Sequence, residues 1–200
     1  MSLPPISLSD NLVKLVPLSD GHIEEFGRFC FDESIWTWYP FAIRDQEDLI
    51  YYVNEAIQNR KAKKELPFAI IEIASNSAVG CTRFMSIDAK NRRAEIGSTW
   101  IDPKWQRTYV NTAAKLLMLR YAFETLKYVR VEFKTDALNL RSRNAIIRIG
   151  ASEEGILRQH MVTESGRLRD SVYFSILDRE WDKVKKDLEE KLGMMSEVRT

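Results

Sequence analysis

Cysteine and histidine are scarce in this sequence, and long apolar runs are missing. Among 200 residues there are two cysteines, Cys30 and Cys81, and two histidines, His22 and His160. None of the four stands at a CxxC or HxxxH spacing, so we expect no metal site. Two thiols without a disulfide framework fit a reducing, cytoplasmic setting. The lack of about 18 consecutive apolar residues predicts no transmembrane helix.

The sequence also lacks a surplus of charge of either sign. It carries 30 Lys and Arg against 29 Asp and Glu, a formal net charge of +1. A dedicated nucleic-acid binder needs a cationic surplus or stripe, so we expect no nucleic-acid partner. No basic region followed by an apolar block opens the chain, so we expect no signal peptide. With 44% apolar and 30% charged residues, the composition is typical of a folded globular protein.

No internal repeat, low-complexity tract or long linker divides the chain, and its length suits one domain. We expect a flexible lead-in over 1–9, a single domain over 10–192 and a C-terminal tail over 193–200. The sequence leaves open whether the protein is a monomer or a homodimer.

Residue periodicity predicts the order β-α-α-β-β-β-α-β-α-β-β-α. The expected strands cover 12–18, 67–74, 79–87, 94–101, 129–135, 155–162 and 169–177. The expected helices cover 20–32, 46 to about 60, 108–126, 140–149 and 181–192, the second of them capped by Asp45. This order indicates a layered α/β fold, with a hairpin-rich sheet followed by one crossover helix.

The helix expected over 108–126 is apolar on most sides, which is typical of a buried, central helix. A strand and a short loop precede it, so the unpaired N–H groups of its first turn could bind an anion such as a pyrophosphate. Alternatively, the loop only joins strand to helix, and Asn111 or Thr112 serves as a local cap. The loop has no glycine, and the physics of the loop by itself favours this second interpretation.

Nearly half of the chain, from Ala94 to Lys185, resembles the GCN5-related N-acetyltransferases (GNAT), in their RimJ/RimL-like branch. The N-terminal half matches only in element order and around Trp36. The residues that carry the resemblance are Ala94–Gly97, Trp105–Gln106, Val110–Thr112, Ala114–Leu117, Arg120–Glu124, Thr135–Ile146, Gly150–Ala151, Glu154–His160, Gly166–Asp170, Tyr173–Ile176 and Glu180–Trp181.

The resemblance implies the GNAT fold, a mixed and mostly antiparallel central sheet flanked by helices. It also implies transfer of an acetyl group from acetyl-CoA to a primary amine, either a protein N-terminus or a small molecule. In the family, backbone N–H groups of a Q/R-x-x-G-x-G/A loop hold the pyrophosphate. Residues 106–111 correspond to that loop, with Tyr109 and Asn111 at the glycine positions. A left-handed backbone at Tyr109 would cost about 1–2 kcal/mol, so either its side chain swings out and the loop still binds phosphate, or CoA binding is weakened.

Further cofactor contacts follow from the resemblance. The strand before the loop pairs with pantetheine in the family, and an asparagine at the position of Asn139 contacts the same arm. Trp100 can equally be a core aromatic, and Asn139 a helix N-cap. The expected cofactor-binding residues are Thr99, Trp100, Ile101, Gln106, Arg107, Thr108, Tyr109, Val110, Asn111, Thr112, Asn139 and Ser142.

Amine acetylation needs a neutral amine, so a carboxylate is a natural proton acceptor. Glu95 is the candidate base, on the strand face that we expect it to share with Gly97 and Thr99. It could instead be a solvent-facing residue paired with an arginine: Arg83, Arg92 or Arg93. His160 is a rival base because its ordinary pKa suits the task, although a lone strand histidine is more often structural.

Two further roles complete the expected site. Ser142 would assist departure of the CoA thiolate, with Tyr173 as a second donor that is more typical of a core. The aromatic segment around Trp36, Tyr39 and Phe41 would form a wall of the acceptor cleft, or else plug the core. With His160, Trp36 and Tyr39 are the expected substrate contacts. The competing hypothesis is a non-catalytic acyl-CoA-binding or interaction module whose loop has decayed at Tyr109.

Overall fold

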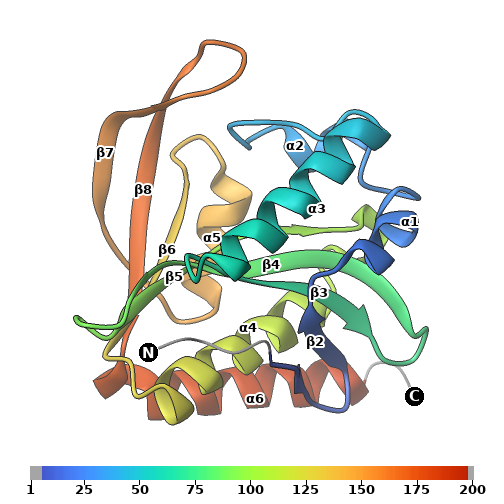
Figure 1. Cartoon of the computed structure of the whole chain (residues 1–200). Helices are drawn as coiled ribbons and strands as arrows, with labels where there is room; N and C mark the ends of the chain where they lie inside the picture. Colours follow the sequence, from blue (N-terminus) through green and yellow to red (C-terminus); the bar gives the residue numbers. More distant parts are fainter. Residues whose placement is uncertain (1–5, 198–200) are drawn as a thin grey trace.

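The computed structural model of the chain describes residues 6–197. A central sheet carries helices on both faces (Figure 1). Its strands are β1 (Leu8–Ser9), β2 (Val13–Pro17), β3 (Leu66–Glu72), β4 (Ser77–Asp88), β5 (Arg93–Ile101), β6 (Arg130–Asp136), β7 (Ser152–Val162) and β8 (Leu168–Leu177). They lie in the order β1-β2-β3-β4-β5-β6-β8-β7. Among the strands within residues 6–197, only β5 and β6 pair in parallel, which confirms the predicted mixed, mostly antiparallel sheet.

The helices divide between the two faces of the sheet. They are α1 (Ile23–Phe26), α2 (Glu33–Trp36), α3 (Gln46–Lys61), α4 (Val110–Arg120), α5 (Leu140–Arg148) and α6 (Trp181–Glu197). In Figure 1, α4 and α6 lie below the sheet, and α1, α2 and α3 lie above it. The crossover between the parallel strands β5 and β6 runs through α4, because parallel neighbours cannot be joined by a tight turn. Asp45 caps α3 as predicted, since its side chain accepts a hydrogen bond from the Asp48 N–H.

Several predicted boundaries differ from those observed. The helix expected over 20–32 is a 3₁₀ turn followed by the four-residue α1, and the short elements β1 and α2 were not predicted. The sheet therefore begins inside the expected lead-in, and α6 continues to Glu197, into the expected tail. Residues 1–5 of that lead-in and 198–200 of that tail lie outside the described residues.

Two apolar clusters fill the space on either side of the sheet. The larger packs the sheet against α4 and α6, and includes Val110, Leu117 and Leu188. The smaller packs it against α1, α2 and α3 around Trp100 and Trp36. Both cysteines are buried and free. Within residues 6–197, no helix is long and apolar enough to cross a membrane, and no cluster of His, Cys, Asp and Glu could hold a metal ion.

Candidate functional site

Strands β5 and β6 separate part of the way along their length. Their parallel ladder covers only three residue pairs, from Arg93–Arg130 to Glu95–Glu132. Both strands then continue, β5 to Ile101 and β6 to Asp136. We call residues 96–101 the open edge of β5. A backbone edge without a neighbouring strand offers its N–H and C=O groups to a ligand.

A β-bulge lies within this open edge. Arg83 on β4 faces Gly97, and Cys81 faces Trp100, so β5 carries one residue more than β4 over this stretch. Ser98 takes the extra place with a positive φ of 47°. Such a bulge shifts the alternation of faces by one residue. As a result, Ile96 and Ile101 both pack in the cluster beneath the sheet, whereas Trp100 packs above it.

The bulge corrects one prediction about Glu95. We expected Glu95 and Thr99 on the same face, but the Thr99 hydroxyl points down to α4, where it accepts a hydrogen bond from Lys115. Glu95 neighbours Ile96 and Ala94, which face down, and it therefore faces up. The error arises because simple alternation does not count an inserted residue.

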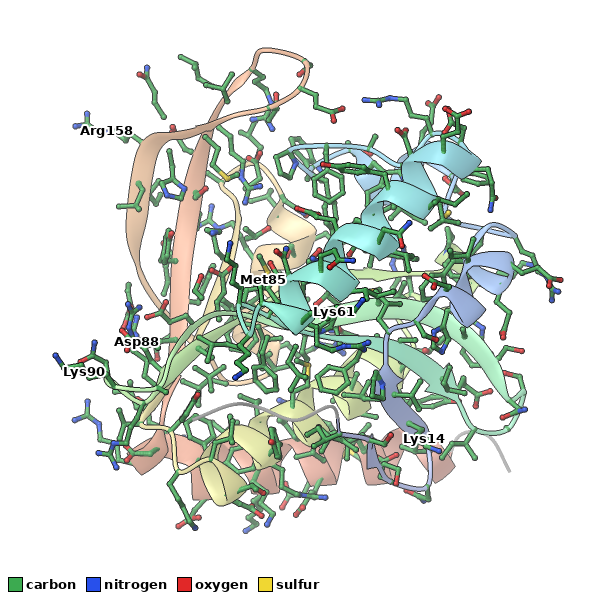
Figure 2. The ribbon with its side chains drawn as sticks, viewed as in Figure 1. Lys14, Lys61, Met85, Asp88, Lys90 and Arg158 are labelled. Atoms are coloured by element: carbon green, nitrogen blue, oxygen red, sulfur yellow. The ribbon has the colours of Figure 1, made fainter. Side chains whose placement is uncertain are left out.

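Glu95 itself is buried, with 5% of its surface exposed, so it does not face solvent. Its ion-pair partner is Lys134 of β6, at 3.4 Å, and not an arginine as we had considered. Arg83 pairs with Glu65, and Arg93 with Glu132 and Asp88. Gly97 leaves space for the carboxylate, because a Cβ there would lie 3.1 Å from Glu95 Oε1 and 2.9 Å from the sulfur of Met85. Figure 2 labels Met85, which lies on β4.

Side chains on both faces of the sheet hold the open edge of β5. From below, Lys115 Nζ donates to Thr99 Oγ1 at 2.6 Å and to Thr82 Oγ1 at 3.1 Å. From above, the Tyr52 hydroxyl bonds Ser98 Oγ at 2.9 Å and accepts from Trp100 Nε1 at 3.0 Å. The Tyr39 hydroxyl donates to the Thr99 carbonyl oxygen. Neither Lys115 nor Tyr52 was predicted for the site, since nothing in their local sequence marks them.

Tyr109 turns inward at the start of α4. Its φ of −66° is right-handed, so the expected strain of a left-handed backbone does not arise there; Arg107 takes the positive φ instead, at 63°. The Tyr109 ring is buried and its hydroxyl donates to the buried Glu72 carboxylate. Burial would raise the pKa of Glu72, but hydrogen bonds from Ser75 and Tyr109 hold that pKa below its ordinary value. Tyr109 thus anchors the loop to the end of β3.

Hydrogen bonds of Gln106 hold the loop before α4 in place, and arginine side chains lie near it. The Gln106 side chain donates to the Ile101 carbonyl at 2.9 Å and accepts from Arg141 of α5. Arg148 of α5 lies 3.5 Å from Thr112 in the first turn of α4. With the exposed Arg107, these arginines place positive charge near the helix N-terminus. Arg141 and Arg148 escaped prediction as a charge cluster, because only the packing of α5 brings them there.

The remaining candidates lie on α5 and β7. Asn139 caps α5, its side chain accepting from the Ser142 N–H at 3.0 Å, as the structural interpretation expected. Ser142 is half-buried at the start of α5. His160 is exposed on β7, with Nδ1 3.0 Å from Ser171 Oγ. In the sheet, strands β8 and β6 lie between β7 and β5, so β7 and β5 are not neighbouring strands.

The aromatic candidates separate into core and site residues. Trp36 is only 5% exposed and donates to the Cys30 carbonyl, and Trp100 is 2% exposed and packs against Phe26. Their side chains are core residues, so for Trp36 the structure agrees with the alternative in which the aromatic segment plugs the core. Tyr39 is half-buried, and its hydroxyl reaches the open edge of β5. Tyr39 therefore remains a candidate for acceptor contact.

These features together fit a long, anionic ligand with amide groups. The open edge of β5 can pair with amides, and the first-turn N–H groups of α4 favour a phosphate group. Arg107, Arg141 and Arg148 supply the opposite charge close to that end. Pantetheine and pyrophosphate are the parts of CoA that have these chemical properties.

Comparison with known proteins gives a consistent result. A family model described as an acetyltransferase (GNAT) domain matches residues 13–152. The chain is 38% identical over 106 residues to the Bacillus subtilis protein named "Putative ribosomal N-acetyltransferase YdaF", covering 53% of this chain and 57% of that one. It is 30% identical over 143 residues to the uncharacterized N-acetyltransferase p20 of Bacillus licheniformis, covering 71% of this chain and 78% of p20.

Solved structures show the same fold. A GCN5-related N-acetyltransferase from Brucella melitensis superposes with a TM-score of 0.87 at 32% identity, over 95% of this chain and 86% of that chain. Mycobacterium smegmatis RimJ, solved in complex with CoA-disulfide, superposes with a TM-score of 0.78 over 96% of this chain and 94% of RimJ. The identity to RimJ is 19%, so this second likeness concerns the fold alone.

Proposed function

The chain belongs to the GNAT acetyltransferase family, and we propose that it moves an acetyl group from acetyl-CoA to a primary amine. The observation that carries the proposal is the position of the open edge of β5 directly before the loop and N-terminus of α4. One end of this site suits the pantetheine arm and the other the pyrophosphate. The cofactor contacts that we propose come from Thr99 to Ile101 and from Gln106 to Thr112, with Asn139 and Ser142 on α5.

In this proposal the amine nitrogen attacks the thioester carbonyl carbon, so that a C–N bond forms and the C–S bond breaks. Glu95, directly or through a water, accepts the proton that leaves the amine. A backbone N–H of the open edge donates to the carbonyl oxygen. Ser142 donates a hydrogen bond to the departing thiolate. The reaction requires no covalent enzyme intermediate, which agrees with the burial of both cysteines.

The acceptor that we propose to test first is the N-terminal amine of a ribosomal protein, because the name of YdaF points to such substrates. Small amines are the second class. Tyr39 and His160 are the acceptor contacts we propose to test. A decayed binding module is disfavoured by the loop itself: Tyr109 is bonded to Glu72, and Gln106 to Arg141.

The test is thermal unfolding of the full chain with and without acetyl-CoA, followed by mass spectrometry of amine products. A ligand at about 100 times its Kd adds about 2.7 kcal/mol of stability, a rise of several degrees in Tm. The variant Tyr109→Phe is expected to lose about 1–3 kcal/mol of stability, because it leaves the buried Glu72 short of a donor. It is expected to keep the shift caused by acetyl-CoA. No shift in the wild type would refute the proposal, and a shift without product on any amine would favour the binding module.

A further inference from the structure

Lys115 is a buried amine in an unusual setting. It lies on α4 with 5% of its surface exposed, within the apolar cluster beneath the sheet. Its hydrogen-bond partners are the hydroxyls of Thr82 and Thr99. Among the residues whose side chains are described, no carboxylate forms an ion pair with it. Burying a charged amine without a counter-ion is costly, and burial lowers the pKa of Lys115 from 10.5 to about 7.

Packing alone does not explain an amine at this place. Met118, one turn further along α4, fills a similar position with an apolar chain, and its sulfur lies 3.6 Å from Thr82 Oγ1. A methionine at 115 would fill the space in the same way without the cost of desolvating an amine. We therefore look for the role of the Lys115 amine in its hydrogen bonds to Thr82 and Thr99.

Those partners connect Lys115 to the open edge of β5. Thr99 belongs to the part of the strand beyond the ladder with β6. Its hydroxyl is held by Lys115 and Thr82, at 2.6 and 2.8 Å, and its carbonyl by Tyr39. Thr82 lies on β4, away from the gap between β5 and β6. Lys115 thus contacts Thr99 from the side of β4, opposite the gap between β5 and β6. It can hold the open edge in place without lying in that gap.

We propose that Lys115 is a positioning residue for acetyl transfer: through the Thr99 hydroxyl it fixes the open backbone edge of β5 at the height and orientation that the acetyl-CoA arm requires. This inference rests on the proposed function. Lys115 touches no reacting atom in it. Without the amine, Thr99 loses a donor and this segment of β5 is freer to move.

The experiment measures the Kd of acetyl-CoA and the Tm of the free protein for a small set of variants of the full chain. Lys115→Met is expected to weaken acetyl-CoA binding about tenfold, as the loss of one hydrogen bond would, and to leave Tm equal or higher. Thr99→Val is expected to weaken binding similarly, while Thr99→Ser, which keeps the hydroxyl, restores it. The double variant that combines Lys115→Met with Thr99→Val is expected to bind acetyl-CoA no more weakly than either single variant, because both substitutions remove the same hydrogen bond.

Thr82→Val is the comparison variant: it removes the Thr82 hydroxyl from both Lys115 and Thr99 but leaves the bond from Lys115 to Thr99 in place. Its Kd is expected to stay within about threefold of the wild type. If Lys115→Met binds acetyl-CoA as the wild type does, the positioning role is refuted and the proposed function stands. If Thr99→Ser is as weak as Thr99→Val, the hydroxyl is not the link and the inference is again refuted. If the wild type does not bind acetyl-CoA, both the inference and the proposed function are refuted.

Discussion

The two halves of β5 are held in different ways. From Arg93 to Glu95, backbone ladders with β4 on one side and β6 on the other fix the strand. From Ser98 to Trp100, only β4 pairs through the backbone. There the side chains of Tyr39, Tyr52, Thr82 and Lys115 add hydrogen bonds to the strand.

The difference fits the role that we propose for each half. A strand edge that receives a ligand cannot also pair with a neighbouring strand, because both would use the same N–H and C=O groups. Its position must then be fixed from the faces of the sheet by side chains. The bulge at Ser98 suits this arrangement, because it lets consecutive residues meet partners above and below.

The largest expected effect falls where the two halves meet. Glu95→Gln removes the proposed proton acceptor at the last paired position and is expected to lower kcat by at least about 100-fold. Binding of acetyl-CoA should persist, since the open edge is unchanged. Steady-state kinetics with the best amine acceptor measures the effect.

Glu132→Gln is the matched control, because Glu132 faces Glu95 in the ladder but is engaged by Arg93 and Arg130. It is expected to lower Tm more than kcat. Equal losses of kcat in both variants would show that Glu95 has no special role.

A smaller effect concerns the pH dependence of stability. With a pKa of about 7 folded and 10.5 unfolded, Lys115 carries its full desolvation cost below about pH 7. Above that pH the unfolded state holds more protons, so stability rises with pH, by at most about 1.4 kcal/mol per unit. Denaturant unfolding of the wild type and Lys115→Met, from about pH 7 to about pH 9, measures the difference. Parallel curves for the two proteins would mean that Lys115 does not titrate in this range.

The smallest expected effect is on the edge contact of Tyr39. Tyr39→Phe removes the hydroxyl that donates to the Thr99 carbonyl and is expected to cost about 1 kcal/mol, or about 2–4 °C in Tm. Tyr51→Phe is the control, because Tyr51 is 73% exposed on α3. Thermal unfolding compares the two, and an equal change in both would show that the Tyr39 contact adds no stability.

Most elements could be predicted from the sequence, because their signals are local. Alternation, apolar runs and turn residues identified the seven longer strands, and Asp45 and Asn139 marked the starts of α3 and α5. The two-residue β1 and the four-residue α2 were missed, since elements so short carry no period. The pairing order of the strands agrees with the fold that the family resemblance implied.

The candidate site could be predicted only in part. The loop at 106–112 and the strand before it were found as a motif. The inward turn of Tyr109 to Glu72 was not, because the two residues are far apart in sequence. The prediction of the sheet face to which Thr99 points was wrong, because one inserted residue reverses the alternation of side chains after it.

By itself, the sequence determined the types and order of the main elements and the family to which the chain belongs. These depend on neighbouring residues and on a motif with fixed spacing. Only the tertiary structure decided which side chains hold the open edge of β5, and that Lys115 and Tyr39 meet at Thr99. Hydrogen bonds between distant segments arise when packing brings their elements together, and no local pattern records them.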